Sequence, residues 1–417
     1  MRKLYDLLSR ATYAHLQIAQ GFSKKLKLFV QGRKSSFPTL TSQIQAGDKT
    51  IWFHCASLGE FEQGVPIMES LRKDYPECKI LVTFFSPSGY EIKKNTPLAD
   101  TVVYLPFDTQ KNARKFLEIV NPVLALFIKY EIWPNYLLEL QLRNIPTLLV
   151  SGLFSKKQVF FKSHGGFMRS ALKAFDHFFV QDRNSVELLN GLGIENVSIS
   201  GDTRFDRVSH QIEQDNSLDF MDAFKGNSLC LVCGSTWPED EGALLPYIND
   251  SQDDIKFVLA PHKIEPSKIE DFRKKLAKPS VLYSEREGKN LNEASVLIVD
   301  TIGLLSKIYS YADIAYVGGA MGSTGLHNIL EPATFGVPII IGNNFDGFPE
   351  AKRLQQLAGL FSISNETECS DILNKLVTDK NFRNKTGMIC GHFVNSNTGA
   401  TRIITQHITQ LYANGLV

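Results

Sequence analysis

The sequence predicts an α/β protein of two domains, each built on a parallel β-sheet with helices on both faces. The chain has 417 residues, which is too long for a single hydrophobic core. Hydrophobic runs of strand length alternate with helical stretches along most of it. The alternation is interrupted once, by the polar segment 206–228. We therefore expect two Rossmann-like domains joined by a polar linker.

The expected strands fall into two blocks, one on each side of the linker. The first block contains the runs 51–55, 79–85, 101–105, 122–128, 147–150, 177–180 and 197–200. The second contains 229–233, 256–260, 280–283, 296–299, 313–317 and 337–341. We place the domains at 36–205 and 229–390. The last segment, 391–417, is expected to form a helix that packs back on the first domain.

The charge of the chain is small but unevenly distributed. Hydrophobic residues make up 43% and charged residues 21%, as in soluble globular proteins. The net charge of +1 argues against nucleic acid as a partner. Residues 1–35 hold eight basic residues and one acidic residue, a net +7, which leaves −6 for the rest of the chain. Such a basic arm is typical of a segment that faces an anionic partner.

The basic arm also carries apolar residues at helical spacing. They are Leu4, Leu7, Leu8, Ala11, Ala14, Ile18 and Phe22. No stretch reaches the ~20 apolar residues needed to cross a bilayer. The pattern favours an amphipathic helix on an anionic membrane surface, so we expect 1–35 to associate with membranes. The alternative is a helix that packs on its own domain with solvated lysines.

The six cysteines are expected to be free thiols in the cytoplasm, because the N-terminus lacks the features of a signal peptide. Cys230 and Cys233 have the spacing of a redox or metal pair. They lie in an expected strand, however, where residues three apart point to opposite faces. The chain has no HExxH, Walker A or GxSxG sequence, and we expect no metal.

In the first domain, two carboxylates follow strand ends. Glu60 closes the turn after strand 51–55, and Glu131 follows strand 122–128. Carboxyl ends of parallel strands meet at one edge of a sheet, where ligands bind. A carboxylate there with a raised pKa can act as a general base near neutral pH. The alternative is that Glu60 merely complements the helix dipole in the first turn.

In the second domain, four turns after strands have the composition of a nucleotide site. They cover 234–239, 261–263, 300–305 and 318–332. The last turn begins with a diglycine and ends with Asn328 and Glu331 at the start of a helix. Glycines let the backbone approach phosphate, helix N-termini favour anions, and a carboxylate can accept ribose hydroxyls. His262 and Lys263 could equally be ordinary loop residues.

Six motifs occur in an order that matches a known family. HCASLGE at 54–60 resembles HxxSxGE, YEIWPN at 130–135 resembles TELWPN, and GDTRFD at 201–206 resembles GxLKFD. GSTWPEDE at 234–241 resembles GSTHEGEE, APHK at 260–263 resembles PRH, and GLHNILEP at 325–332 resembles GGHNPLE. The chain thus resembles the 3-deoxy-D-manno-octulosonic acid (Kdo) transferases of lipopolysaccharide synthesis, glycosyltransferase family 30, over nearly its whole length.

The resemblance implies a GT-B fold and an inverting transfer of Kdo from CMP-Kdo to a lipid A precursor, lipid IVA. It implies action at the cytoplasmic face of the inner membrane, without metal or cofactor. Glu60 falls where the family has its general base, and Glu131 and Arg204 fall where it supports the transition state. The positions matching its CMP site are Ser235, Pro261, His262, Lys263, Gly303, Leu304, Leu305, Asn328, Ile329, Leu330 and Glu331.

The chain departs from the family pattern at four places. Arg204 replaces a lysine, His262-Lys263 replaces Arg-His, Leu304 replaces an acidic residue and Leu326 replaces a glycine. Two alternatives remain open. One is another GT-B enzyme, a UDP-sugar transferase or sugar-nucleotide epimerase, which CMP and UDP binding would separate. The other is a non-catalytic membrane-surface protein built on a transferase fold, which turnover would exclude.

Overall fold

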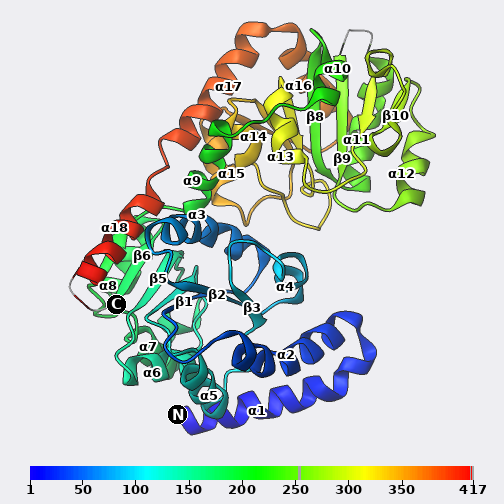
Figure 1. The fold of residues 1–417 in the computed structure, drawn as a ribbon. Helices are drawn as coiled ribbons and strands as arrows, with labels where there is room; N and C mark the ends of the chain where they lie inside the picture. The colour runs from blue at the N-terminus through cyan, green and yellow to red at the C-terminus, as the bar shows by residue number, and fades with distance from the viewer. Residues whose placement is uncertain (252–254, 414, 416–417) are drawn as a thin grey trace. The chain divides into compact units, whose positions relative to one another are not determined.

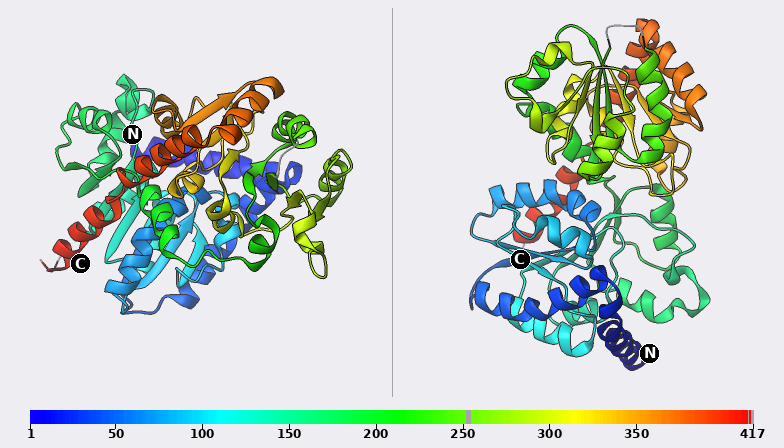
Figure 2. Two further views of the ribbon diagram at one scale, coloured as in Figure 1. Left: turned by 90° about the horizontal axis from the view of Figure 1, so that it is seen from above. Right: turned by 90° about the vertical axis from the view of Figure 1, so that its right-hand side faces the viewer.

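The computed structural model describes residues 1–251, 255–413 and 415, which form two compact units (Figure 1). Unit 1 comprises Met1–Arg207 and Thr398–Val417, and unit 2 comprises Val208–Asn397. Within the described residues each unit contains one seven-stranded, fully parallel sheet. Helices cover both faces of the sheets (Figure 2). The predicted α/β fold class is confirmed.

The sheet of unit 1 reverses its strand order between β1 and β4. Its strands, in spatial order, are β3 (Thr101–Tyr104), β2 (Lys79–Phe84), β1 (Thr50–Cys55), β4 (Leu124–Ile128), β5 (Thr147–Gly152), β6 (His177–Val180) and β7 (Val197–Ile199). Each corresponds to a predicted run. In such sheets the crevice at the reversal, outside the carboxyl ends, is where ligands bind.

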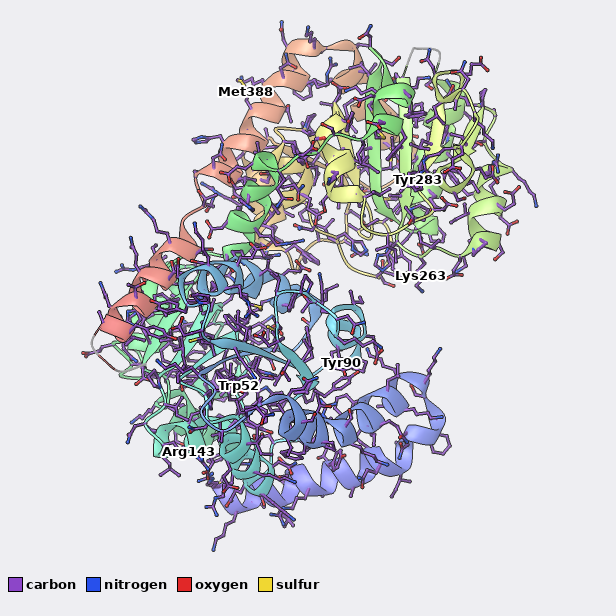
Figure 3. All side chains as sticks on the ribbon, viewed as in Figure 1. Trp52, Tyr90, Arg143, Lys263, Tyr283 and Met388 are labelled. Atoms are coloured by element: carbon purple, nitrogen blue, oxygen red, sulfur yellow. The ribbon has the colours of Figure 1, made fainter. Side chains whose placement is uncertain are left out.

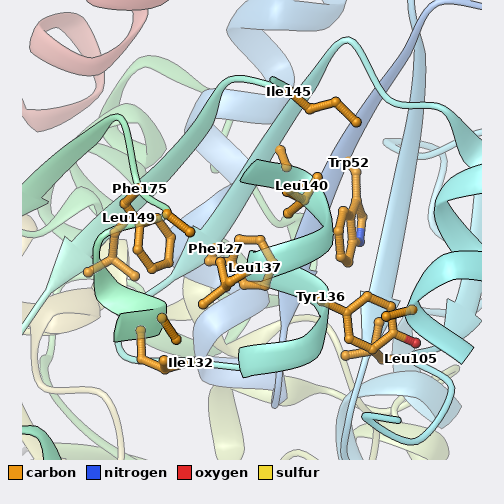
Figure 4. Packing of buried hydrophobic residues seen from close by; sticks show 14 of the residues in the cluster. Trp52, Leu105, Phe127, Ile132, Tyr136, Leu137, Leu140, Ile145, Leu149 and Phe175 are labelled. Atoms are coloured by element: carbon orange, nitrogen blue, oxygen red, sulfur yellow. The ribbon is translucent and has the colours of Figure 1, made fainter. Parts of the chain in front are cut away.

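The helices of unit 1 bury one hydrophobic cluster on each face of this sheet. They are α1 (Arg2–Ala19), α2 (Lys24–Gln43), α3 (Leu58–Asp74), α4 (Pro87–Lys93), α5 (Gln110–Val120), α6 (Pro134–Leu142), α7 (Gly166–Leu172), α8 (Arg183–Asn190), α9 (Thr203–His210) and α18 (Ala400–Ala413), with short 3₁₀ turns at Gln20–Phe22, Val159–Phe161 and Ser163–Gly165. Trp52 and Phe127 belong to one cluster (Figure 4), and Phe53 and Ile128 to the other. Strand residues therefore alternate between two cores, as in sheets covered on both faces.

Helix α18 belongs to unit 1 although it comes last in the chain. Its Ile404 and Ile408 are buried in the same cluster as Phe53. The segment 391–417 is therefore divided between two helices, because its first residues end α17 (Lys380–Asn395).

Helix α2 is held to the sheet of unit 1 by a buried guanidinium. Arg33 donates hydrogen bonds to the carbonyl oxygens of Leu105, Phe29 and Phe85, at 3.0, 2.8 and 2.7 Å. Its guanidinium carbon lies 3.6 Å from the centroid of the Phe29 ring. Burial lowers the pKa of Arg33 to about 10.

No described helix combines the length and apolar character that crossing a bilayer requires.

The sheet of unit 2 also reverses its strand order, between β8 and β12. Its strands, in spatial order, are β10 (Ser280–Leu282), β11 (Val296–Ile298), β9 (Ile255–Pro261), β8 (Leu229–Thr236), β12 (Ile314–Val317), β13 (Ile339–Gly342) and β14 (Leu360–Ile363). The sequence predicted all of these except β14. That strand is a four-residue edge strand whose Phe361 and Ser362 are only half-buried, so it lacks a continuous apolar run.

The helices of unit 2 include one inside the segment predicted as a linker. They are α10 (Asp219–Lys225), α11 (Pro238–Asp250), α12 (Pro266–Arg273), α13 (Leu305–Ile308), α14 (Leu330–Thr334), α15 (Pro349–Gln356), α16 (Glu366–Thr378) and α17, with 3₁₀ turns at Gln211–Glu213, Tyr283–Glu285, Leu291–Glu293 and Tyr309–Tyr311. In α10, Met221 and Phe224 are fully buried in the core of unit 2.

All six cysteines lie in the described part of the chain, where they are buried and free. Cys230 belongs to one core cluster of unit 2 and Cys233 to the other. The two thiols therefore point to opposite faces of β8, as predicted. They serve as small core side chains, not as a redox or metal pair.

Candidate active site

The candidate site of unit 1 lies at the start of α3, directly after β1. Ser57 has extended backbone and is the N-cap residue, and Glu60 occupies the first turn of the helix. The Ser57 backbone N–H donates to Glu60 Oε2 at 3.0 Å, half of a capping box. Only 7% of Glu60 is exposed. Glu60 therefore both caps the start of α3 and carries a buried carboxylate.

The surroundings of Glu60 favour its protonated form. Burial, followed by the negative charge of Glu131, raises the pKa of Glu60 to about 7. The backbone N–H groups of Ser57 and Ala56 and the ammonium group of Lys129 act in the opposite direction. A carboxylate with a pKa close to the working pH is suited to accept a proton from a hydroxyl group.

Glu131 comes to this place because the chain turns sharply after β4. Lys129 has a φ of 68°, a left-handed conformation that is rare outside glycine. Such local strain is concentrated at functional sites. Since β1 and β4 are neighbours at the reversal of strand order, their end loops bring the two carboxylates together.

The carboxylate of Glu131 is held by an indole. Trp133 Nε1 donates to Glu131 Oε2 at 3.0 Å and to His54 Nε2 at 2.8 Å. The same Glu131 oxygen lies 3.6 Å from His54 Nε2. His54 itself is fully buried at the end of β1. Sequence reasoning named neither His54 nor Trp133 as a site residue, although both stand in the motifs HCASLGE and YEIWPN.

Arg204, on α9, is engaged by an aspartate two residues before it. Its Nε and one terminal nitrogen lie 2.9 and 2.8 Å from Asp202 Oδ2. Burial acts to raise the pKa of Asp202, but Arg204 outweighs it and leaves this pKa below its usual value. Asp202 also accepts from Gln63 Nε2 at 3.0 Å. Because Gln63 lies one turn after Glu60 on α3, this anchor ties Arg204 to the helix that carries the candidate base.

A second candidate site, in unit 2, surrounds the reversal of strand order in that sheet. Ser235 has a φ of 54° at a register shift near the end of β8. Gly318 follows β12, and a Cβ there would lie 2.4 Å from the Ser235 carbonyl oxygen. Gly319 has a φ of 97°, and its N–H donates to buried Asp240 at 2.8 Å. Glycines are required at both positions, one for close approach and one for conformation.

The start of α13, which follows β11, meets the start of α14 through a hydrogen bond from Ser306 to Glu331. Ser306 Oγ donates to Glu331 Oε2 at 3.4 Å, and Asn328 Nδ2 donates to Oε1 at 3.2 Å. Asn328 Oδ1 also accepts from the Leu330 N–H at 3.1 Å. The predicted segments 303–305 and 328–331 are thereby brought together. Ser306 is a contact that the sequence analysis missed.

The turn 261–263 joins the same region through stacked rings. The His262 ring lies 4.8 Å from Trp237 and 4.3 Å from His327, centroid to centroid. Trp237 Nε1 donates to His327 Nε2 at 3.1 Å, and Lys263 Nζ lies 4.9 Å from the Trp237 ring centroid. Figure 3 labels Lys263 on unit 2. Since His327 precedes Asn328, the turn after β9 lies beside the start of α14.

Lys263 is the cation in this cluster. Burial lowers the pKa of His327 to about 4, and burial followed by the charge of Lys263 lowers that of His262. Both imidazoles are therefore neutral near pH 7.

A pocket of about 210 Å³ opens here, lined by Trp237, Pro261, Lys263 and surrounding residues. Among the residues that the structure describes, no group of three or more His, Cys, Asp or Glu is placed to hold a metal ion.

Comparison with known proteins identifies relatives over most of the chain. Residues 23–207 match the family described as "3-Deoxy-D-manno-octulosonic-acid transferase (kdotransferase)". The 3-deoxy-D-manno-octulosonic acid transferase of Rickettsia felis is 30% identical over 355 residues, 83% of this chain and 74% of that protein. The enzyme of the same description from Haemophilus influenzae is 29% identical over 366 residues, 84% of each chain.

A solved structure supports the fold. The UDP-GlcNAc 2-epimerase of Neisseria meningitidis, bound to UDP-GlcNAc, is 14% identical, with a TM-score of 0.63 over 87% of this chain and 100% of that one. At this identity the likeness concerns the fold alone, which is of the GT-B type. The sequence relatives carry the assignment further: the protein belongs to the 3-deoxy-D-manno-octulosonic acid (Kdo) transferase family.

Proposed function

We propose that this chain is an inverting glycosyltransferase that moves Kdo from CMP-Kdo to the lipid A precursor lipid IVA in lipopolysaccharide core biosynthesis. The observation that carries the mechanism is the buried carboxyl of Glu60, whose pKa is raised to about 7 beside Glu131. Membership of the family supports Kdo as the transferred sugar. The paired carboxylates provide a group that can activate an acceptor hydroxyl.

In the proposed reaction, Glu60 takes the proton from the acceptor hydroxyl as its oxygen attacks the anomeric carbon of Kdo. The bond from that carbon to the phosphate oxygen of CMP breaks, and CMP leaves with the bonding electron pair. Attack from the opposite face inverts the anomeric configuration. Glu131 and Arg204 are assigned to support of the transition state, and no metal is required if fixed charges stabilise the leaving phosphate.

CMP binding is assigned to unit 2. Glu331 is proposed to accept hydrogen bonds from the ribose hydroxyls, and Lys263 to face the phosphate. The other members of the proposed CMP site are Ser235, Pro261, His262, Gly303, Leu304, Leu305, Asn328, Ile329 and Leu330. The contacts of Glu331 with Ser306 and Asn328 support this assignment because they already orient its carboxylate.

We assign the enzyme to the cytoplasmic face of the inner membrane, held peripherally by α1 and α2. The supporting surface combines exposed apolar side chains, Leu4, Leu7, Leu8, Ile18, Phe22 and Leu28, with exposed lysines, Lys24, Lys25, Lys27 and Lys34. Phe22 is 91% exposed at the turn between the helices. Large exposed apolar side chains beside cations suit an anionic membrane surface.

The structure reduces the charge that the arm can offer to a membrane. Arg2 pairs with buried Glu139 at 2.9 Å, and Arg10 pairs with Asp6 at 2.8 Å. Arg33 belongs to α2, but its side chain is buried against the sheet of unit 1 and cannot reach a membrane. Lysines on the exposed side of α2 therefore carry the proposed electrostatic attraction.

The direct test of the function is incubation with CMP-Kdo, generated in situ, and tetraacylated lipid A precursor, followed by mass spectrometry. A mass increase by one or more Kdo residues is expected, and the increase counts the sugars added. NMR of the product then reports its anomeric configuration, which is inverted relative to the donor. Turnover of a UDP-sugar in place of CMP-Kdo would support the alternative GT-B reaction, and absence of any turnover would support a binding protein.

Glu60→Gln should lower kcat by ~10²–10⁴, the usual effect of losing a general base. The amide can still accept the Ser57 N–H, so folding and CMP affinity should be preserved. Turnover measurements, circular dichroism and calorimetry check these three properties. Glu69→Gln, on the exposed side of the same helix, is the control and should leave kcat unchanged. Turnover of Glu60→Gln equal to wild type would remove Glu60 from the mechanism.

The pH profile should identify the same group. Glu60 must be ionised to accept a proton, so kcat/KM should rise with pH and level off above about pH 7. Glu131→Gln removes a negative charge that raises the pKa of Glu60, so the rising limb should move to lower pH. The profile is measured from pH 5 to 9 with saturating acceptor. A limb that stays in place in Glu131→Gln would mean that another group titrates.

Glu331→Ala should weaken CMP binding about 10- to 100-fold, because it removes a charged acceptor of ribose hydrogen bonds. The variant should also lose the preference for CMP over deoxy-CMP, which isothermal calorimetry with both nucleotides measures. Glu366→Ala, an exposed first-turn glutamate of α16, is the matched control and should bind CMP normally. Unchanged affinity and ribose preference in Glu331→Ala would contradict the assignment.

The enzyme should bind anionic vesicles peripherally, with binding that weakens as salt rises, since each basic residue near the surface contributes about 1 kcal/mol. Replacing Lys24, Lys25 and Lys27 together by Glu should reduce co-sedimentation and activity on membrane-embedded acceptor. Activity on detergent-dispersed acceptor should fall less.

The control for this charge reversal is the triple Glu variant of Lys156, Lys157 and Lys162, which are exposed elsewhere on unit 1. This variant should bind vesicles as wild type does. Vesicle binding that responds neither to salt nor to the α2 substitutions would show that the arm serves only to pack on its own unit.

A further inference from the structure

A continuous chain of side-chain hydrogen bonds runs from the core of unit 1 to the carboxylate of Glu131. Trp52 Nε1 donates to Thr83 Oγ1 at 2.8 Å, and His54 Nδ1 lies 2.8 Å from the same oxygen. On its other side, His54 Nε2 meets Trp133 Nε1 at 2.8 Å. The indole N–H of Trp133 is shared with Glu131 Oε2 at 3.0 Å.

The donors in this chain fix which nitrogen of His54 carries the proton. An indole N–H can only donate, so His54 Nε2 accepts from Trp133 and bears no proton. The proton of neutral His54 is therefore on Nδ1, where it is donated to Thr83 Oγ1. The Thr83 hydroxyl accepts from both Trp52 and His54, and it donates to the Phe53 carbonyl oxygen at 3.4 Å.

This arrangement also excludes an ion pair between His54 and Glu131. If His54 Nε2 carried a proton, two N–H groups would point at each other across the 2.8 Å that separates His54 Nε2 from Trp133 Nε1, and they would repel. The 3.6 Å approach of His54 Nε2 to Glu131 Oε2 is therefore bridged by the indole hydrogen that both atoms accept. Because Glu131 is only slightly exposed, this shared donor contributes to fixing the direction of its carboxylate.

Local structure makes this assembly rigid. Thr83 and His54 lie opposite each other in the register of β2 and β1, fully buried. Trp133 is the extended residue that precedes Pro134, the first residue of α6. The Trp133 ring also packs on Phe85, with centroids 4.7 Å apart. The two strands and one helix start thus hold the indole in one orientation.

We propose that His54 and Thr83 are positioning residues of the transferase: they set one histidine tautomer, which orients Trp133 so that its indole N–H aims the Glu131 carboxylate at the neighbouring candidate base. This inference deepens the proposed function and rests on it. The structure thereby assigns catalytic importance to Thr83, a core threonine far in sequence from both carboxylates.

The first test deletes one hydroxyl group. Thr83→Val should lower kcat roughly 10- to 100-fold, in the range that misplacement of a catalytic group produces, with KM for CMP-Kdo unchanged. Thr83→Ser restores the hydroxyl and should regain most of the activity. Thr147→Val is the matched control, since Thr147 is a fully buried threonine of the same sheet whose hydroxyl bonds to Ile145 O. It should leave kcat unchanged.

The second test observes the tautomer directly, and does not depend on turnover. Nitrogen-15 NMR of wild-type protein should show one histidine, assigned by its absence in His54→Gln, with a protonated Nδ1 and an unprotonated Nε2. This signature should disappear in Thr83→Val and persist in Thr83→Ser and Thr147→Val. Trp133→Phe keeps an aromatic ring but removes the indole N–H together with part of the ring, and should lower kcat similarly, which covers the case in which Thr83→Val fails to fold.

The proposal is overturned if His54 carries its proton on Nε2, or if Thr83→Val and Trp133→Phe lower kcat no more than Thr147→Val does. Failure of the proposed function is distinguishable, because it would appear as wild-type turnover in Glu60→Gln while the His54 signature remained in place.

Discussion

The reversal of strand order in each sheet is the constraint from which the candidate site of each unit follows. Parallel strands present all their carboxyl ends at one edge, and helices leave neighbouring strands at the reversal toward opposite faces. In unit 1, β1 leads to Glu60 and β4 leads to Glu131. In unit 2, β8 leads to Ser235 and β12 to the diglycine at Gly318. Within each unit, the residues at the ends of these two strands are neighbours because the strands are adjacent at the reversal.

Burying Glu60 beside a second carboxylate costs stability. Its pKa rises from 4.5 to about 7. A shift of this size makes the ionised carboxyl less compatible with the folded state by about 3 kcal/mol, since one pKa unit corresponds to about 1.4 kcal/mol. The stabilisation of the fold by the protonated group is complete below about pH 4.5 and is lost as pH rises through about 7. The left-handed backbone of Lys129, two residues before Glu131, adds strain beside the second carboxylate, and that of Ser235 adds strain near the end of β8 in unit 2.

The sequence was sufficient for the strand blocks and for the positions of the strand-end turns, because apolar runs and glycines report burial and backbone conformation directly. It was insufficient wherever a side chain's role depends on a distant partner. A charge count assigned Arg2 and Arg33 to a membrane-facing arm, whereas Glu139 pairs with one and core carbonyls bind the other. The chain through Thr83 and His54 joins residues from separate strands and separate motifs, so it has no local signature. The sequence did not predict β14, because a short, half-buried edge strand lacks the continuous apolar run by which the other strands are recognised.

At two of the four departures from the family pattern, contacts in the structure explain how the replacement side chain is held. A lysine at position 204 would present a single ammonium, whereas Arg204 grips Asp202 with two nitrogens, a geometry that only a planar guanidinium allows. At 262–263 the family's arginine is absent, but Lys263 keeps one cation beside Trp237, and the imidazole of His262 stacks on the same indole. With the pKa of His327 lowered to about 4, that imidazole adds no positive charge beside Lys263 near pH 7. At Arg204 and at Lys263, therefore, the replacement retains one cation and changes how that cation is held.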